Sequence, residues 1–477
     1  MTDPIKSTVE YGRELFAHLE EFFLQATGKS AAKFATIETF GDVIRASASE
    51  IGPRAKAAFR WLDTEVRTFH ARRGRDAFKD AAQLGGMNLV FGGSSRFHRS
   101  QLNSVSTAVL YSDTVLIPDP VMPWLEKDRT EERFRHVLLL QAVHALLQLK
   151  PLVDADLPYP PVVVFPSWEK LLEDHDAQTQ EGISQLLTDV LSNSLGEAFA
   201  GLEEVFDFAG RNSERFCETV DRNRLFVAPG GSVNEPLGEA LSRYEKEMAT
   251  WRSGDWVNAF GRLPIHRRVL TGISERIAPI YHLLENAQEL GGHPLMCLKQ
   301  HAHYFRLVSH TSSARLEKLE VLDPRTSALV DALSSRRLRW LGGIPAETLA
   351  KLRLDNENVV FRKRLASSVG KLHESVLDDV DRVAAEVCHD LEDAIAEHEK
   401  ELRSIQEKYN RVHGQTALIT VAAAGAALMP SLAPLLGGAA PFALAAKYGH
   451  DKVAELAEKR ALTQSLVGVL AASKPED

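Results

Sequence analysis

The stretch from Thr107 to Asp128, TAVLYSDTVLIPDPVMPWLEKD, sets the fold class of this chain. Its apolar run, TVLIP, is followed by Asp119 and by two further prolines, Pro120 and Pro123. Proline fixes the backbone and cannot continue a sheet ladder, so this pattern predicts a buried strand that ends in a rigid corner. We expect Asp119 to cap the turn at that corner.

Similar apolar runs occur on either side of this stretch, with helical segments between them. MNLVFGG precedes it, and PPVVVFPS and NRLFVAPGGS follow it. Strands that lack polar alternation fit a sheet covered on both faces, and long helices between strands are typical of parallel βαβ units. The pattern predicts a helix-dominated α/β protein with a small central parallel or mixed sheet.

Four regions follow from the same reading. We expect a helical segment in 1–84, a small α/β domain in 85–262, a helical domain with one long helix in 263–411, and an apolar helical hairpin and tail in 412–477. In the first region Tyr11, Leu15, Leu19 and Phe22 recur at helical spacing, which predicts a packed face.

Composition limits the classes of function. The chain has 477 residues, a formal net charge of −9 and three cysteines. An acidic balance offers no general basic field, so nucleic acid is not expected as a primary partner. A sparse and odd number of cysteines argues against a disulfide framework, and the sequence predicts a cytoplasmic protein.

The C-terminal region contains the most unusual stretch. No Asp, Glu, Lys or Arg occurs in the 35 residues from Val412 to Ala446. Prolines and glycines in its middle predict a break into two helical arms, each too short or too charged for a simple membrane span. Two interpretations stay open: a hairpin buried by the rest of the protein, and an element that reaches a membrane through residues 416–446 after activation.

Three sets of residues are candidates for chemistry. Gly92, Gly93, Ser94 and Arg96 follow the first predicted strand, where backbone N–H groups and a guanidinium could hold phosphate, although the spacing matches neither a Walker loop nor GxGxxG. The same residues also fit an ordinary turn.

Asp113 and Asp119 flank the second predicted strand. Acidic pairs hold magnesium in nucleases, but six residues of extended chain span about 20 Å, too far for one ion unless the chain turns. A rigid corner at Asp119 is the more economical interpretation.

His293, Cys297 and His301 stand four residues apart, so on a helix they would share one face. Histidine and cysteine bind zinc, but another segment would have to complete the site, and His136 or His144 could supply it. The alternative is that all are ordinary packed histidines. Zinc and magnesium are thus candidate cofactors, and neither is strongly indicated.

Three stretches together resemble uncharacterised bacterial proteins, some of the kind found among toxin and phage-defence genes. They are FGGSSRFHR with LYSDTVLIPDP, then GGIPAETLAKLRLDNENVVFRKRLASSV, then the small-residue apolar tail. The resemblance implies a defence or toxin-like effector or interaction protein, with a protein partner or a second copy as its binding partner. The alternative from the residues is a metal-dependent hydrolase, most plausibly a nuclease.

Overall fold

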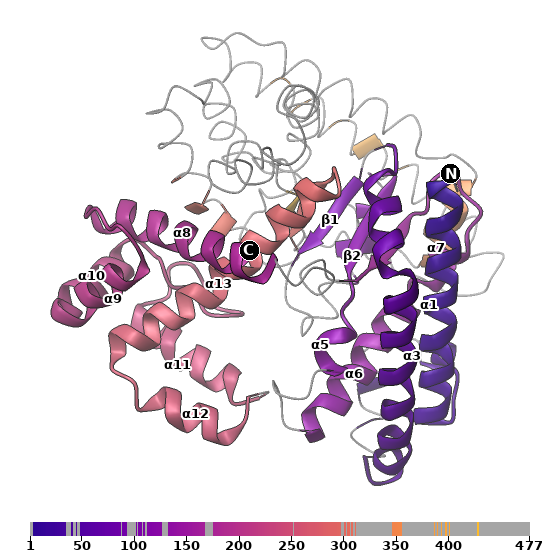
Figure 1. The fold of residues 1–477 in the computed structure, drawn as a ribbon, viewed down its shortest axis with the longest axis horizontal. Helices are drawn as coiled ribbons and strands as arrows, with labels where there is room; N and C mark the ends of the chain where they lie inside the picture. The colour runs from indigo at the N-terminus through magenta and orange to yellow at the C-terminus, as the bar shows by residue number, and fades with distance from the viewer. Residues whose placement is uncertain are drawn as a thin grey trace.

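The structure is a computed structural model, and part of the chain is described. The described residues are 3–34, 40–41, 44, 48–86, 88–92, 102, 104–106, 108–109, 112–125, 132–166, 175–250, 252–296, 300–301, 303–305, 307–308, 311, 346–354, 386, 389, 393, 396–397, 400 and 427–428. Figure 1 shows a small sheet between two groups of helices.

The sheet contains five short strands. They are β1 (Asn88–Gly92), β2 (Thr114–Pro118), β3 (Val162–Phe165), β4 (His293–Met296) and β5 (Ala427–Leu428). Their order is β3-β2-β1-β4-β5. β1 pairs in parallel with β2 and β4, β2 pairs in parallel with β3, and β5 lies antiparallel to β4. The predicted central parallel sheet is therefore confirmed.

Alternate residues of the strands enter two different cores, one on each face of the sheet. Leu89, Val115 and Val162, which are paired in register, belong to the first core. Their successors Val90, Leu116 and Val163 belong to the second. Because both faces are covered, the strands need no polar side, which explains their uninterrupted apolar runs.

The first helical layer is built on two long N-terminal helices, α1 (Pro4–Thr27) and α3 (Ala48–Ala82), with a short 3₁₀ turn, η1 (Ala31–Lys33), after α1. Asp3 caps α1 through a 3.0 Å bond from the Ile5 N–H, and Gly28, at φ 69°, ends it in the left-handed region. The predicted face of α1 is fully buried, which confirms that prediction.

Shorter helices complete this layer. They are α5 (Met122–Leu125), α6 (Glu132–Leu147), α7 (Lys150–Asp154) and α16 (Ala346–Leu354). Residues of α16 join the same core as α1 and β1, so this core combines several of the regions predicted from the sequence.

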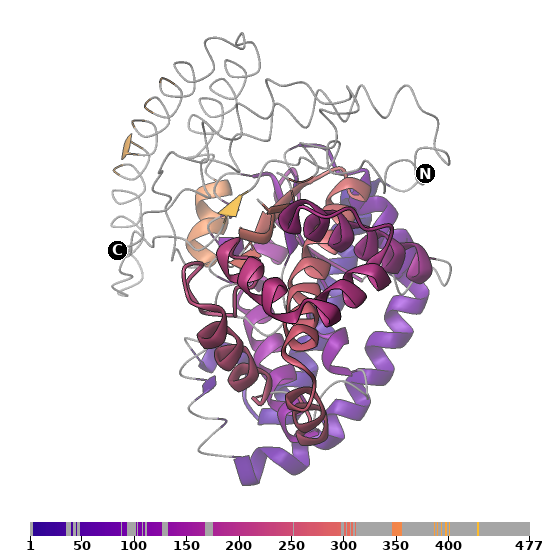
Figure 2. The ribbon, with the colours of Figure 1, turned by 90° about the vertical axis from the view of Figure 1, so that its left-hand side faces the viewer.

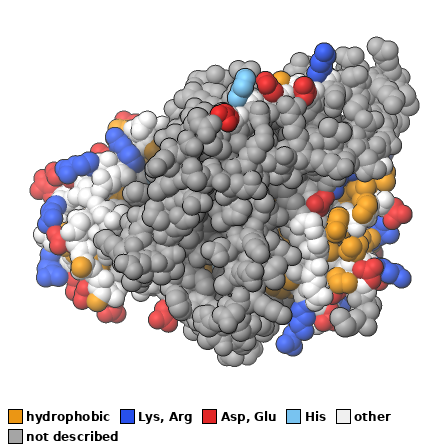
Figure 3. All heavy atoms as spheres, turned by 90° about the horizontal axis from the view of Figure 1, so that it is seen from above, with side chains coloured by type: hydrophobic (Ala, Val, Ile, Leu, Met, Phe, Trp, Pro, Cys, Tyr) orange, Lys and Arg blue, Asp and Glu red, His pale blue; other side chains and the backbone are white. Residues whose placement is uncertain are grey.

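The second helical layer covers the opposite face. It comprises α8 (His175–Leu195), α9 (Leu202–Arg211), α10 (Ser213–Arg222), α11 (Leu237–Met248), α12 (Gly254–Gly261) and α13 (Ile265–Glu289). Figure 2 shows these helices in front of the first layer. Figure 3 shows basic and acidic side chains mixed at the end of the molecule where α9 and α10 lie, with no single sign of charge prevailing there.

One predicted strand is wrong. NRLFVAPGGS forms an extended loop between α10 and α11, although Leu225, Phe226 and Val227 are buried. A side chain replaces the neighbouring strand: the Tyr304 hydroxyl donates to the Leu225 carbonyl at 3.0 Å and accepts from the Val227 N–H at 2.9 Å. The segment therefore has the apolar composition of a buried strand, although it pairs with no strand of the sheet.

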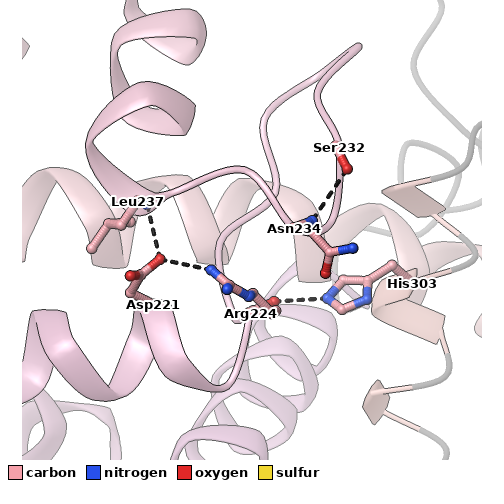
Figure 4. Close-up of polar contacts among 6 residues, drawn as sticks. All are labelled: Asp221, Arg224, Ser232, Asn234, Leu237 and His303. Carbon is pink, nitrogen blue, oxygen red and sulfur yellow. Dashed lines mark hydrogen bonds and ion pairs between the residues drawn. The ribbon is translucent and has the colours of Figure 1, made fainter.

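Close contacts fix the same loop at both ends, as Figure 4 shows. Asp221 accepts bonds of 2.9 Å from the Leu237 N–H and from Arg224, and His303 donates to the Arg224 carbonyl at 2.8 Å. Gly230, at φ 69°, and the bond from the Asn234 N–H to Ser232 belong to the turn that reverses the chain.

The region after 263, expected to be almost entirely helical, also contains a strand, because β4 enters the sheet at His293. Most of the predicted long helix and hairpin lies outside the described residues. Ala427 and Leu428, expected at the end of a helical arm, form β5 instead. In the described part of the chain, no helix is both long and apolar enough to span a bilayer.

Candidate functional site

The strand order creates one distinctive position at the sheet edge. From β1 the chain first builds outward through β2 and β3, and then returns to place β4 on the other side of β1. In open parallel sheets such a reversal leaves a crevice at the carboxyl ends of the two central strands, where ligands usually bind. Here that position lies beyond Gly92 and Met296, the last residues of β1 and β4.

Of the predicted phosphate-binding residues, Gly92 ends β1 and so stands at this position. Gly93, Ser94 and Arg96 follow it directly in the chain but lie outside the described residues. Phosphate binding by this stretch stays a prediction.

Asp119 lies at the carboxyl end of β2 and forms the predicted corner. Its backbone N–H donates to the Phe165 carbonyl at 2.7 Å, and its Oδ1 accepts from the Val121 N–H at 2.8 Å. Its Oδ2 lies 2.9 Å from Nε2 of His70. The prediction that Asp119 caps this turn is confirmed, and both of its carboxylate oxygens are engaged by the protein.

The contact with His70 extends to a third buried side chain. Nδ1 of His70 lies 2.9 Å from the Tyr11 hydroxyl, so α1, α3 and the end of β2 are joined by one chain of bonds. Tyr11, His70 and Asp119 are 1%, 7% and 3% exposed. Burial, followed by the charge of Asp119, raises the pKa of Tyr11 well above its usual value. The tautomer with its proton on Nε2 donates to Asp119 and leaves Nδ1 to accept from the Tyr11 hydroxyl.

Little in the amino-acid sequence indicates this network. Tyr11 was recognised only as a packing residue, and His70 stands 49 positions from Asp119 and 59 from Tyr11. No local spacing signals a contact over that distance.

Asp113 lies at the opposite, amino end of β2. Its carboxylate is 3.8 Å from the buried guanidinium of Arg353, which also donates to the Val109 carbonyl at 2.9 Å and to the Ser112 carbonyl. Asp113 thus helps to attach α16 to the turn before β2. Because β2 is extended between the two aspartates, one magnesium ion held by both is excluded.

The helical face predicted for His293, Cys297 and His301 is wrong. α13 ends before Gly291, at φ 59°, and β4 starts at His293, so no single helix carries the three residues. Cys297 lies outside the described residues. His301 is buried, and this burial, with the charge of Arg276, lowers its pKa to about 3.

The two additional histidines have structural partners. His136 packs against the ring of Phe59, with centroids 4.8 Å apart. His144 is fully buried, stacks on Phe40 and lies 3.3 Å from the Phe34 carbonyl, and burial lowers its pKa to about 4. Within the described ranges, no three His, Cys, Asp or Glu side chains are grouped so that they could hold a metal ion.

Comparison with protein-family models, with curated proteins and with solved structures found no match for this chain.

Proposed function

We propose that this protein is a bacterial effector or interaction protein of the defence type, triggered by a small phosphate-bearing ligand. The ligand binds at the carboxyl edge of the sheet between β1 and β4, and the C-terminal apolar region, expected to form a sequestered helical hairpin, is the output. Release of that region acts on a membrane or on a protein partner, which includes a second copy of the chain.

The observation that carries this proposal is the strand order with its reversal between β1 and β4. The stretch that directly follows β1, Gly93-Ser94-Ser95-Arg96, has the composition that phosphate sites favour: small residues that let backbone N–H groups approach an anion, and a guanidinium. The apolar composition of 412–446 supports the second half of the proposal, since such a segment requires shelter from water.

A metal-dependent hydrolase is supported less well. Asp119 would have to exchange its bonds to His70 and to the Val121 N–H for a metal ion. Asp113 lies at the other end of β2 and forms an ion pair with Arg353. No described contact therefore favours either aspartate as a metal ligand.

The binding half is tested by titrating the purified full-length chain with a panel of nucleoside phosphates in isothermal calorimetry. We expect one member to bind with a stoichiometry of about one, and Arg96→Ala to weaken that binding about tenfold. Absence of binding by every phosphate compound would contradict the trigger.

The output half is tested by dye leakage from anionic liposomes with the full chain and with a chain truncated after Arg411, each with and without the ligand. Ligand-dependent leakage by the full chain alone is expected. Equal leakage by both chains would exclude the tail as the membrane-active element, and a ligand-dependent change of oligomeric state without leakage would assign the output to protein partners.

A further inference from the structure

Arg276 on α13 is a buried cation without a matching acceptor. Its side chain is 5% exposed, and its Nε and Nη2 atoms have no hydrogen-bond partner in the described part of the chain. A buried guanidinium carries a large desolvation cost unless it is paired, so an arrangement of this kind normally has a counter-charge.

Among the residues that the structure describes, no carboxylate is bonded to Arg276. Its guanidinium lies over the ring of Tyr244, 5.1 Å from the centroid. The neighbouring carboxylate, Glu275, already accepts bonds from the Tyr244 hydroxyl at 2.6 Å and from Arg252 at 3.1 Å. Both oxygens of Glu275 are thus used by other groups, and no bond links this carboxylate to Arg276.

The position of Arg276 along α13 places it near the carboxyl edge of the sheet. α13 packs against β1 and β4, and only residues 290–292 separate it from β4, so the chain reverses direction there. Arg276 precedes the end of α13 by 13 residues, about 20 Å of helix, whereas a four-residue strand spans about 13 Å. Arg276 is therefore level with the carboxyl end of β4, at Met296.

Electrostatic effects on the residues after β4 agree with this placement. Burial lowers the pKa of His301 to about 3, and the charge of Arg276 adds to this effect. Burial raises the pKa of Tyr304 to about 12, and the bond from the Val227 N–H and the charge of Arg276 oppose that rise. Next to His301, the buried Gln300 has an Nε2 group without a hydrogen-bond partner in the described ranges. His303 and Tyr304 fix this segment to the α10–α11 loop, as described above.

The helix itself is irregular beside Arg276. Pro279 lies inside α13 and has no N–H to donate to the Glu275 carbonyl one turn earlier. Such a position bends a helix and is a point where it can open locally. Because Arg276 is almost fully enclosed, a ligand needs an opening of this kind to reach it.

We infer that Arg276 is the anion receptor of the ligand site between β1 and β4, and that it binds a phosphate group of the trigger. Unsatisfied guanidinium N–H groups match phosphate oxygens in geometry as well as charge. This inference rests on the proposed function, since it assigns a residue to the same site. The inference adds Arg276 of α13 to the site, and no motif in the sequence indicates this residue.

The inference is tested with the full-length chain by thermal unfolding in inorganic phosphate, in acetate and in chloride at equal ionic strength. We expect phosphate to raise the unfolding temperature of the wild type by about 3 °C over chloride, and acetate to raise it less. An equal effect of acetate would assign the site to carboxylates, which would overturn the choice of phosphate.

Arg276→Met should abolish the phosphate-dependent shift, while Arg276→Lys should keep part of it because it retains the charge without the fork. Arg267→Met is the matched control, since Arg267 is an exposed arginine on the same helix and should leave the shift unchanged. A phosphate shift that persists in a folded Arg276→Met protein would overturn the inference.

Calorimetry with the nucleoside phosphate found for the wild type separates the two proposals. Loss of about tenfold or more in affinity for Arg276→Met supports the receptor role. Unchanged affinity would leave the trigger intact and remove Arg276 from it. If the wild type binds no phosphate compound at all, both proposals fail together.

Discussion

Two buried polar clusters, one on each face of the sheet, differ in how completely their groups are bonded. On the face covered by α1 and α3, Tyr11, His70 and Asp119 form a complete chain in which every contact is 2.9 Å. On the face covered by α13, Arg276 and Gln300 keep donors that no described residue accepts. Both sets are almost fully buried, so the difference does not come from depth in the fold.

A complete network and an incomplete one have different uses. Satisfied buried groups rigidify the elements that they join, and here they fix two long helices to the corner after β2. Unsatisfied donors cost free energy in the empty protein and regain it when an acceptor binds. The first cluster therefore serves the architecture of the fold, and the second is one that an added acceptor would stabilise.

Acid should destabilise both faces, and this is the largest effect that we expect. The pKa values of His144 and His301 are lowered from 6.5 to about 4 and about 3, so between pH 6.5 and 4 the unfolded chain binds more protons than the folded chain. Stability falls as the pH falls through this window. At pH 4.5 each histidine should cost on the order of 2 kcal/mol.

Urea unfolding at pH 7 and pH 4.5 measures this loss. His144→Phe and His301→Phe should each remove about half of the histidine contribution, one for each core, whatever they cost at pH 7. The same pH dependence in both variants as in the wild type would mean that neither histidine is held neutral by burial.

Asp119→Ala should be the most damaging substitution at neutral pH. It leaves the His70 ring and the Val121 N–H without their acceptor inside a closed core, and we expect a loss of about 3 kcal/mol in the free energy of unfolding. Tyr11→Phe removes only the terminal hydroxyl and should cost about 1 kcal/mol. If Asp119→Ala kept full stability but lost ligand binding, Asp119 would belong to the site and the contrast between the faces would fail.

Sequence patterns predicted the sheet because strands buried on both faces consist of apolar residues alone, as VLIP and VVVF do. They predicted the Asp119 corner because proline and aspartate act locally. They failed for NRLFVAP, where a buried loop has the composition of a strand, and for HPLM, which is too short to be distinguished from its helical neighbours. The partners of Asp119 and the isolation of Arg276 depend on contacts between distant segments, so no local pattern carries them.

Arg276→Met should have the opposite sign to Asp119→Ala. In the absence of ligand, removing an unpaired buried charge and filling its space with an apolar side chain should raise the free energy of unfolding by about 1–2 kcal/mol. Urea unfolding in chloride buffer without phosphate measures it, with Arg267→Met as the control near zero. A large loss of stability would show that Arg276 has a structural partner, and both the contrast and the receptor role would then be wrong.

Asp113→Asn should have the smallest effect, which tests the contrast between the two ends of β2. The ion pair with Arg353 is long, at 3.8 Å, and the Asp113 side chain is 22% exposed, so solvent screens it. Arg353 keeps its bonds to the Val109 and Ser112 carbonyls in the variant. We expect a loss of about 0.5 kcal/mol in urea unfolding and unchanged affinity for phosphate compounds. Weaker phosphate binding in this variant would place chemistry at the amino edge of the sheet, where the strand order predicts none.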